Sequence, residues 1–532
     1  MKNNIWRKCF AAVLSLMLLL SVALPTNATV LLGDVNGDGK LTVFDAQMLL
    51  ESAFQLRNLT PEQLAAAGNA TVSQLLESIL GKKEGQTPVK EFVVPEGGYD
   101  GSPVTVTFYY NLGGDLPLIL EKYCAQFQEL YPSITVELIN LRNFSGNHEQ
   151  VLQDIAAGTT PNLVYNQAVH FAEYQQLDVL VPLDTLIESD IAVTRADGTT
   201  EILGLTKEQK DDFIAAFLAD GSQFDDGLTY TLPFAKQTDL LYYNKTFFDQ
   251  HGLKVPTTWD EMEEVCQQIQ RIDPTAIPLG VDSEVDWFAS MCAQQDSPYL
   301  SATGEHYLFD DARNHAFAER FNQWYQKGYM TTGRLTGEYY MSGYFAGHRD
   351  VPCYMSVSSS VATLYMRPIT DENGGYLFEA GVAMLPQAEP ADPKVFALGI
   401  SMGIFQKEDP QEVLATWLLS KYLATNVDFQ AEFAQASGYI PTIRSVTDRP
   451  DFAAYLATAD GTEHLDAQVA KVCLEQQAAY VTMPYFDGIK NAQEEVGMLL
   501  HNCLSMTGND LEEQIAAAFW QTVENCKKAE SN

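Results

Sequence analysis

The segment from Leu228 to Glu264, LTYTLPFAKQTDLLYYNKTFFDQHGLKVPTTWDEMEE, decides the fold of this chain. It contains two β-rich runs separated by a short break, and then a helix start. In that start Thr258 can cap the first turn, and Glu261 follows three residues later to complete a capping box. Apolar residues then recur at the spacing of one helix face, at Met262, Val265, Cys266 and Ile269. The segment therefore predicts two successive strands followed by an amphipathic helix.

Upstream of this segment, strand and helix patterns alternate from Pro103 onward. We predict strands at 104–110, 134–141 and 162–165, and helices at 116–131 and around 151–158. This order indicates parallel strands with helices on both faces, a fold that binds ligands at the carboxyl ends of its strands. Two asparagines follow strands in this way and are candidate binding residues, although asparagine at a strand end also caps turns: Asn111 and Asn166.

Several motifs resemble one protein family. The pattern LPF…LYYNK…GL…P-x-TWDE in the first segment is similar to that of solute-binding proteins that serve sugar-importing ABC transporters. AGTTPNLV at 157–164, the serine-rich turn at 356–360, GVAMLP at 381–386 and SGYIP at 437–441 extend the resemblance through 103–532. On these motifs the chain resembles family 1 extracellular solute-binding proteins, including maltose- and glycerophosphodiester-binding members.

The resemblance implies an α/β fold of the two-lobed, clam-shell type, periplasmic-binding-protein type II. We expect lobe 1 at about 103–225 plus 378–440, and lobe 2 at about 235–370 plus 445–532. It also implies a function without covalent chemistry. Such a protein captures a carbohydrate solute by closing its lobes and hands it to an ABC transporter permease in the membrane.

Sugar recognition requires polar groups for hydroxyls and aromatic faces for the sugar ring. By resemblance, the residues that contact ligand are Lys236, Gln237, Ser358, Ser359, Gly399 and Tyr439. The first two depart from the family pattern, which favours a different or partly anionic ligand. Trp287 is the expected stacking platform, with a core tryptophan as the alternative.

A calcium-binding motif lies near the amino terminus. Oxygen donors recur at loop positions 1, 3, 5, 7, 9 and 12, supplied by Asp34, Asn36, Asp38, Lys40, Thr42 and Asp45. The loop resembles a dockerin repeat, which implies a small all-α, EF-hand-like module at 29–81 that holds Ca²⁺. The second repeat is degenerate because its Asp-rich loop is missing. Two interpretations stay open: a cohesin-binding module, or a calcium-stabilised spacer.

The first residues of the chain predict secretion, and its net charge limits the kinds of partner. Residues 1–28 have the basic start, apolar run and small-residue cleavage site of a signal peptide, and Cys9 precedes that run, so there is no lipobox cysteine. We expect a secreted or surface-associated protein with a linker at 82–102. With 70 acidic and 32 basic residues, the net charge of -38 argues against nucleic-acid partners.

The remaining cysteines show no metal-ligand or disulfide spacing, so most are expected to be buried core residues: Cys124, Cys266, Cys292, Cys353, Cys473, Cys503 and Cys526. Three other functions are alternatives to solute binding. The G-x-S-x-G motif at 399–403 would suit a serine hydrolase, but Ser401 lies within a predicted strand. A glycosidase needs two opposed carboxylates, and a surface scaffold, an adhesin or a cellulosome-associated carbohydrate-active protein stays an alternative. We predict a binding protein and not an enzyme.

Overall fold

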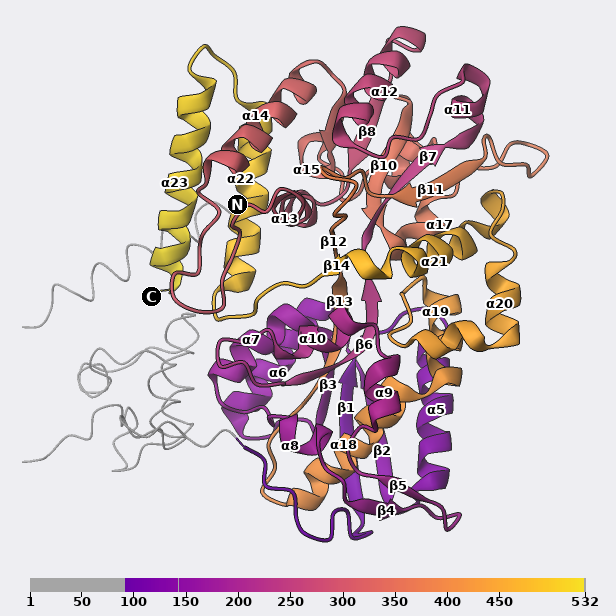
Figure 1. Cartoon of the computed structure of the whole chain (residues 1–532), viewed down its shortest axis with the longest axis vertical. Helices are drawn as coiled ribbons and strands as arrows, with labels where there is room; N and C mark the ends of the chain where they lie inside the picture. The colour runs from indigo at the N-terminus through magenta and orange to yellow at the C-terminus, as the bar shows by residue number, and fades with distance from the viewer. Residues whose placement is uncertain (1–90, 142, 531–532) are drawn as a thin grey trace, which may run out of the picture. The chain divides into compact units, whose positions relative to one another are not determined.

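The computed structural model describes residues 91–141 and 143–530, which contain two five-stranded sheets (Figure 1). The first sheet has the strand order β2-β1-β3-β13-β6. Its strands are β1 (Val104–Tyr110), β2 (Ile134–Asn140), β3 (Leu163–Gln167), β6 (Thr231–Gln237) and β13 (Leu398–Ile404). The second sheet has the order β11-β7-β10-β8-β9. Its strands are β7 (Asp239–Asn244), β8 (Ile277–Val281), β9 (Met330–Thr332), β10 (Cys353–Ser359) and β11 (Ala380–Met384).

The first lobe is built around the first sheet. β1 pairs in parallel with β2 and β3, as the alternating sequence pattern predicts, whereas β13 returns antiparallel between β3 and β6. The main helices of this lobe are α5 (Leu116–Leu130), α6 (Phe144–Ala157), α7 (Ala168–Gln176), α18 (Pro410–Thr425) and α19 (Val427–Ser437). Phe108, Phe127 and Trp417 belong to one buried core cluster of this lobe. The predicted strands and helices between 104 and 167 are confirmed.

The second lobe is built around the second sheet. β8 is parallel to β9 and β10, and β7 is antiparallel to β10 and β11. Its main helices are α11 (Lys245–His251), α12 (Trp259–Ile272), α13 (Glu284–Gln294), α14 (Ala312–Gln326), α21 (Leu465–Glu475), α22 (Ile489–Ser505) and α23 (Leu511–Glu530). The predicted capping box at the start of α12 is confirmed, because the Glu261 N–H donates to Thr258 Oγ1 at 3.1 Å and the Thr258 N–H donates to Glu261 Oε2 at 3.3 Å.

Two crossings between the lobes lie side by side. β6 passes into β7 through Thr238, and β12 (Val395–Phe396), which pairs with β14 (Tyr480–Val481), passes into β13 through Ala397. The Thr238 hydroxyl donates to the Phe396 carbonyl oxygen at 2.7 Å and joins the crossings. The lobe boundary differs from the predicted one, because the backbone of β11 pairs with β7 in the second sheet and the chain re-enters the first lobe only at β13.

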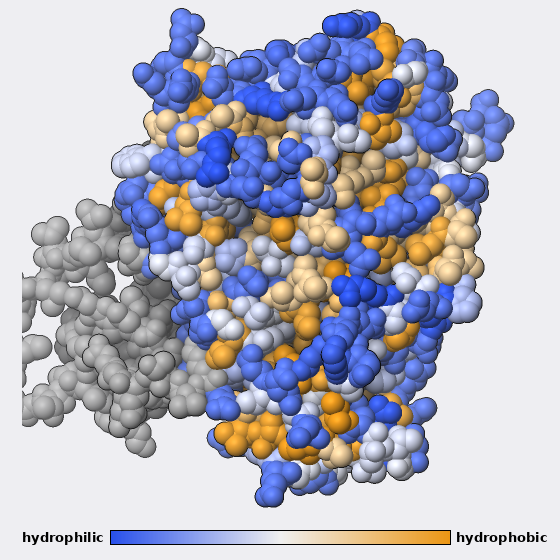
Figure 2. Space-filling view, in the orientation of Figure 1, coloured by the Kyte–Doolittle hydropathy of each residue, from blue (hydrophilic) through white to orange (hydrophobic). Residues whose placement is uncertain are grey.

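Short elements connect the larger ones. They are β4 (Ala192–Thr194), β5 (Thr200–Ile202), α8 (Asp184–Ile187), α9 (Lys207–Asp212), α10 (Ala215–Ala219), η1 (Asp220–Ser222), α15 (Gly333–Thr336), α16 (Ser342–Phe345), η2 (Ser360–Ala362), α17 (Thr363–Met366), η3 (Arg444–Asp448), α20 (Pro450–Leu456), η4 (Thr462–His464) and η5 (Gln477–Ala479). The seven cysteines in the described ranges are unpaired and buried, as predicted. Figure 2 shows hydrophobic residues interspersed among hydrophilic ones on one face. Within 91–141 and 143–530, no helix is long and apolar enough to cross a membrane.

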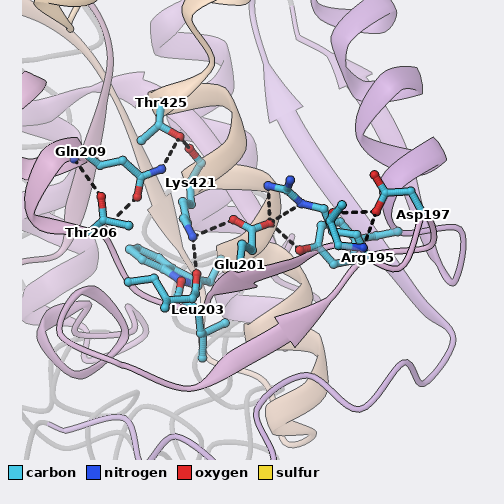
Figure 3. A network of polar contacts seen from close by, with 12 residues as sticks. Arg195, Asp197, Glu201, Leu203, Thr206, Gln209, Lys421 and Thr425 are labelled. Atoms are coloured by element: carbon cyan, nitrogen blue, oxygen red, sulfur yellow. Dashed lines mark hydrogen bonds and ion pairs between the residues drawn. The ribbon is translucent and has the colours of Figure 1, made fainter.

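A polar network fixes the β4–β5 hairpin to the helices of the first lobe (Figure 3). Glu201 in β5 accepts hydrogen bonds from Tyr131 Oη at 2.5 Å, Arg195 Nε at 3.0 Å and Lys421 Nζ at 2.8 Å. Burial alone would raise the pKa of Glu201, but Lys421, Tyr131 and Arg195 together hold it below its ordinary value. Burial of Lys421 outweighs the attraction of Glu201 and lowers the lysine pKa. The network therefore depends on a charged Glu201.

Glu201→Gln is expected to lower the free energy of unfolding by about 1–3 kcal/mol near neutral pH, because buried Lys421 loses its charged partner. The folded-state pKa of Glu201 is depressed. Its stabilising contribution is therefore complete above the unfolded-state pKa of about 4.3 and is lost as the pH falls through the folded-state pKa. Urea unfolding at several pH values should show the difference between wild type and variant shrinking below about pH 4.

Glu188→Gln is the matched control. The Glu188 side chain is 71% exposed and pairs with Lys210, so its loss should change stability by less than about 1 kcal/mol. Equal effects of the two substitutions at neutral pH would show that the Glu201 network does not stabilise the hairpin.

Candidate functional site

The candidate site lies where strands of the second sheet end beside the crossing into the first lobe. Asp282 follows the last residue of β8, Ser359 is the last residue of β10, and Asp239 opens β7 directly opposite Ser359. Because β8 and β10 are parallel, their carboxyl ends share one edge of the sheet. Ligands of α/β proteins bind at such edges.

Asp282 holds two elements of this edge together. One carboxylate oxygen accepts a hydrogen bond from the Met341 N–H at 2.6 Å, and the other accepts one from the buried Ser358 hydroxyl. Burial raises the pKa of Asp282 to about 7. The side chain thereby ties the loop between α15 and α16 to the end of β10.

Asp239 and Asp286 join Asp282 in what we call the carboxylate cluster. Burial raises the pKa of Asp239 well above its ordinary value, and the charges of Asp286 and Asp282 raise it further. Burial also raises the pKa of Asp286, against a hydrogen bond with Ser283 at the start of α13. All three side chains are only partly buried. The cluster therefore presents carboxyl groups that can take part in hydrogen bonds at the sheet edge, and burial favours their uncharged form.

Three tyrosines beside the cluster form what we call the tyrosine wall. Tyr339, Tyr340 and Tyr365 are 84%, 52% and 67% exposed. The first two rings lie edge to face with centroids 4.6 Å apart. Burial, followed by the charges of Tyr339 and Asp282, raises the pKa of Tyr340 to about 12. The wall thus lies within electrostatic range of the carboxylate cluster.

The first lobe contributes Tyr439 to the same region. Burial raises the pKa of Tyr439 to about 12, against a hydrogen bond with Tyr165 and with a smaller contribution from Tyr340. Tyr165 lies in β3, and Ile440 pairs with Lys236 of β6 through two backbone hydrogen bonds. Aromatic residues from both lobes therefore approach one another here.

The structure brings four of the sequence-predicted binding residues to this region. Gln237 ends β6 and accepts a hydrogen bond at 3.1 Å from the Ser359 hydroxyl, and both side chains are partly buried. Ser358 contacts Asp282, and Tyr439 lies within range of Tyr340. Their contact with a ligand stays a prediction.

The two predicted asparagines lie in the first lobe. Asn111 is partly buried, and its side-chain oxygen accepts a hydrogen bond from Asn147 at 3.3 Å. Asn166 is fully buried, and its oxygen accepts a hydrogen bond from the Gln167 N–H at 2.8 Å at the start of α7. Asn166 therefore shapes the turn after its strand, the alternative role of such asparagines.

The sequence predicts Lys236 as a ligand contact. In the structure its side chain is buried and forms an ion pair inside the protein. It is 1% exposed and donates hydrogen bonds to Asp220 at 2.5 Å and to Ser401 at 3.2 Å. Tyr485 donates to the other oxygen of Asp220 at 2.7 Å. Since Asp220 neutralises Lys236, this lysine no longer favours an anionic ligand. Ser401 is likewise buried inside β13, as predicted, and is no exposed nucleophile.

Gly399 and Trp287 have structural roles; for Trp287 this corrects the expected stacking role, whereas ligand contact at Gly399 stays a prediction. Gly399 has φ of +139°, and a Cβ there would lie 2.6 Å from the Ala235 carbonyl oxygen, so glycine permits the close approach of β13 to β6. Trp287 is completely buried and packs edge to face on Phe321 and Phe317, with ring centroids 4.4 and 5.2 Å away. Trp287 is therefore a core residue of the second lobe.

The predicted calcium loop and the signal peptide lie outside the described residues and stay predictions. The carboxylate cluster and the tyrosine wall were not predicted, because their residues are far apart along the chain and only the fold brings them together. One signal was available: Asp282 directly follows the apolar run Ile277–Val281, as expected for a ligand-binding strand end.

Comparisons with known proteins agree with this architecture. The sequence model of the family described as bacterial extracellular solute-binding protein matches residues 122–459. The sn-glycerol-3-phosphate-binding periplasmic protein UgpB of Shigella flexneri serotype 5b is 21% identical over 367 residues, covering 65% of this chain and 75% of that protein.

Solved structures of similar fold include two sugar- or phosphodiester-binding proteins. The sugar-binding protein MalE of Xanthomonas citri has a TM-score of 0.62 and 20% identity, with 81% of this chain and 100% of that chain covered. UgpB of Mycobacterium tuberculosis in complex with glycerophosphocholine has a TM-score of 0.59 and 18% identity, with coverage of 81% and 100%. With a family match that spans more than half of its length, this chain belongs to the bacterial extracellular solute-binding protein family.

Proposed function

We propose that this protein captures a carbohydrate solute outside the cell and delivers it to the permease of an ABC importer. The observation that carries the proposal is the meeting of exposed tyrosines and clustered carboxylates at the junction of the two lobes. Aromatic faces can stack on the apolar side of a sugar ring, and carboxylates accept hydrogen bonds from its hydroxyls.

The charge of the site favours a sugar over a phosphate ester. Relatives named UgpB bind sn-glycerol-3-phosphate, and the similar MalE structure is named for sugar binding. A phosphate group beside Asp239, Asp282 and Asp286 would be repelled whenever one of these carboxyl groups is ionised, since like charges at short range are unfavourable. Lys236 offers no compensation because it is already paired with Asp220.

Lobe closure would couple to solute binding. Gln237 and Tyr439 belong to the first lobe, whereas Ser359 and Tyr340 belong to the second. A solute that touches both sets gains contacts only when the lobes approach, and this difference in affinity favours the closed state.

The test is thermal unfolding of the purified chain against mono- and oligosaccharides and glycerol phosphates. A solute at about 100 times its Kd should add roughly 2.7 kcal/mol of stability and raise the midpoint. Tyr340→Ala should abolish most of the shift, whereas Trp520→Ala, which removes a ring that is 57% exposed on α23, should retain it. A solute that is consumed during the assay would indicate an enzyme instead.

The amino-terminal module is part of the same proposal. We infer that the loop from Asp34 to Asp45 binds one Ca²⁺, because oxygen donors occupy all the required loop positions. The module would then act as a calcium-stabilised spacer. Cohesin binding is the alternative, and it would require an intact second repeat.

Asp34→Ala with Asp38→Ala is expected to weaken calcium binding at least about tenfold, because two of the charged ligands are removed. Calorimetric titration of the purified chain with CaCl₂ measures this and should give one site per wild-type chain. Asp371→Ala, which removes an acid from a turn in the second lobe, is the control. Binding that is unaffected by the double substitution would rule out the loop as the site.

A further inference from the structure

The segment 338–341 carries two of the three tyrosines of the wall, and its backbone is held at both ends. At one end the Glu338 N–H donates a hydrogen bond to the Gly333 carbonyl oxygen at 3.0 Å. At the other end the Met341 N–H donates to Asp282 at 2.6 Å, and the Met341 side chain is completely buried. The two tyrosines lie between these anchors and are the most exposed part of the segment. A fixed backbone therefore presents exposed rings.

Gly280 lies directly under the carboxyl-terminal end of this segment. It is a buried residue of β8, and a Cβ added to it would lie 2.8 Å from Met341 Cβ and 3.1 Å from Met341 Cγ and Cε. Carbon atoms at optimal contact are about 3.5–4.0 Å apart. A side chain at Gly280 would therefore push Met341, and with it the neighbouring Tyr340, away from the sheet. Glycine inside a strand commonly marks such a close approach.

Gly333, the first residue of α15, lies under the other end of the segment. A Cβ there would lie 3.0 Å from the Glu338 carbonyl oxygen and 3.2 Å from the Tyr339 carbonyl oxygen. Neither Gly280 nor Gly333 has a positive φ, so the backbone conformation at these two positions does not require glycine. What both positions require is the absence of a side chain.

From these contacts we propose that Gly280 and Gly333 are positioning residues for solute binding, because they let the segment 338–341 sit closely enough to hold Tyr339 and Tyr340 in place for the solute. The inference rests on the proposed solute-binding function and deepens it. Rings that are already in place lose little conformational freedom when a solute binds, so more of the contact energy appears as affinity.

Gly280→Ala and Gly333→Ala test the effect on affinity, with Gly343→Ala as the matched control. Gly343 lies in α16 just beyond the segment, and a Cβ there would meet nothing closer than Arg349 at 3.8 Å. Each chain is titrated calorimetrically with glucose, maltose, maltotetraose and cellobiose, well below its unfolding midpoint. Gly280→Ala should weaken binding about tenfold and Gly333→Ala, which forces a smaller displacement, about threefold. The control should bind as the wild type does.

The position of the Tyr340 ring can be measured without any solute. Fluorine NMR of the chain with 3-fluorotyrosine at position 340 should show a shifted or broadened resonance in both test variants and an unchanged one in Gly343→Ala. The same label at Tyr422, in α18 of the first lobe, should not respond to any of the three substitutions. A purely structural role of the two glycines would lower the unfolding midpoint without moving the resonance at position 340.

The outcomes separate this inference from the proposed function. A saccharide whose binding is lost in Tyr340→Ala but unchanged in both Gly280→Ala and Gly333→Ala would keep the function and overturn the inference. An unmoved resonance at position 340 in both variants would also overturn it. A resonance that moves in both variants while no saccharide binds any chain would reject carbohydrate capture and support the positioning of the rings. Thermal midpoints show whether each variant has folded, and Gly333→Ala keeps the test decisive if Gly280→Ala does not fold.

Discussion

Lys236→Ala is expected to lower the free energy of unfolding by about 3–5 kcal/mol, because it leaves the buried carboxylate of Asp220 without its positive partner. Both side chains of this pair are only 1% exposed. In the variant, Asp220 would keep a single neutral donor, Tyr485. Urea unfolding followed by circular dichroism measures the loss. The contacts of Asp220 with Lys236 and Tyr485 also join β6 to the segment after β14, so the loss of stability should reach both lobes.

Two further variants make the Lys236 prediction specific. Lys245→Ala removes a lysine that is 38% exposed and pairs with Asp249 and Glu379, and it should cost less than about 1 kcal/mol. Replacing both buried partners with apolar residues, Lys236→Met with Asp220→Leu, should restore much of the stability because no buried charge is left unpaired. If Lys236→Ala were as mild as Lys245→Ala, the ion pair would not be the structural element described here.

Trp287→Ala is expected to lower the free energy of unfolding by about 3–5 kcal/mol, because it opens a large cavity in the core of the second lobe. Phe317, Phe321 and Trp259 surround the ring and cannot all relax into the space. Solute affinity, measured below the unfolding transition, should change little. A stacking platform would show the reverse pattern, with large loss of affinity and little loss of stability.

Trp520→Ala is the control for Trp287, since its ring is 57% exposed on α23. Substitutions at such surface positions usually change stability by less than about 0.5 kcal/mol. If Trp287→Ala lost solute binding strongly but kept a normal unfolding midpoint, Trp287 would be a solute contact after all.

Most helices and strands could be predicted because helix caps and apolar periodicity depend only on residues near one another in the sequence. The capping box at Thr258 and Glu261 and the apolar face of α12 need only a few positions along the chain, and both are present. β1 and the helix after it were predicted for the same reason. The return of β13 between β3 and β6 was not predicted, because pairing between strands so far apart in the sequence leaves no periodic mark in it.

The candidate site was harder to predict, because a side chain's role depends on what tertiary packing places beside it. Lys236 is a hydrophilic residue in a ligand-binding motif, yet its partner Asp220 lies in η1 and buries it. Trp287 follows Asp286 directly, but helix α13 turns the tryptophan toward the core and leaves Asp286 near Asp239. The tyrosine wall combines the loop between α15 and α16 with the short helix α17, whose proximity only the fold establishes.

The most direct test of the account is a crystal structure of the chain with the solute that raises its thermal midpoint most. We expect the solute between the two lobes, with one face against Tyr340 and Tyr439 and its polar groups against Asp239, Asp282 and Ser359. A solute bound elsewhere, or bound to one lobe only with no contact to the carboxylate cluster, would contradict it.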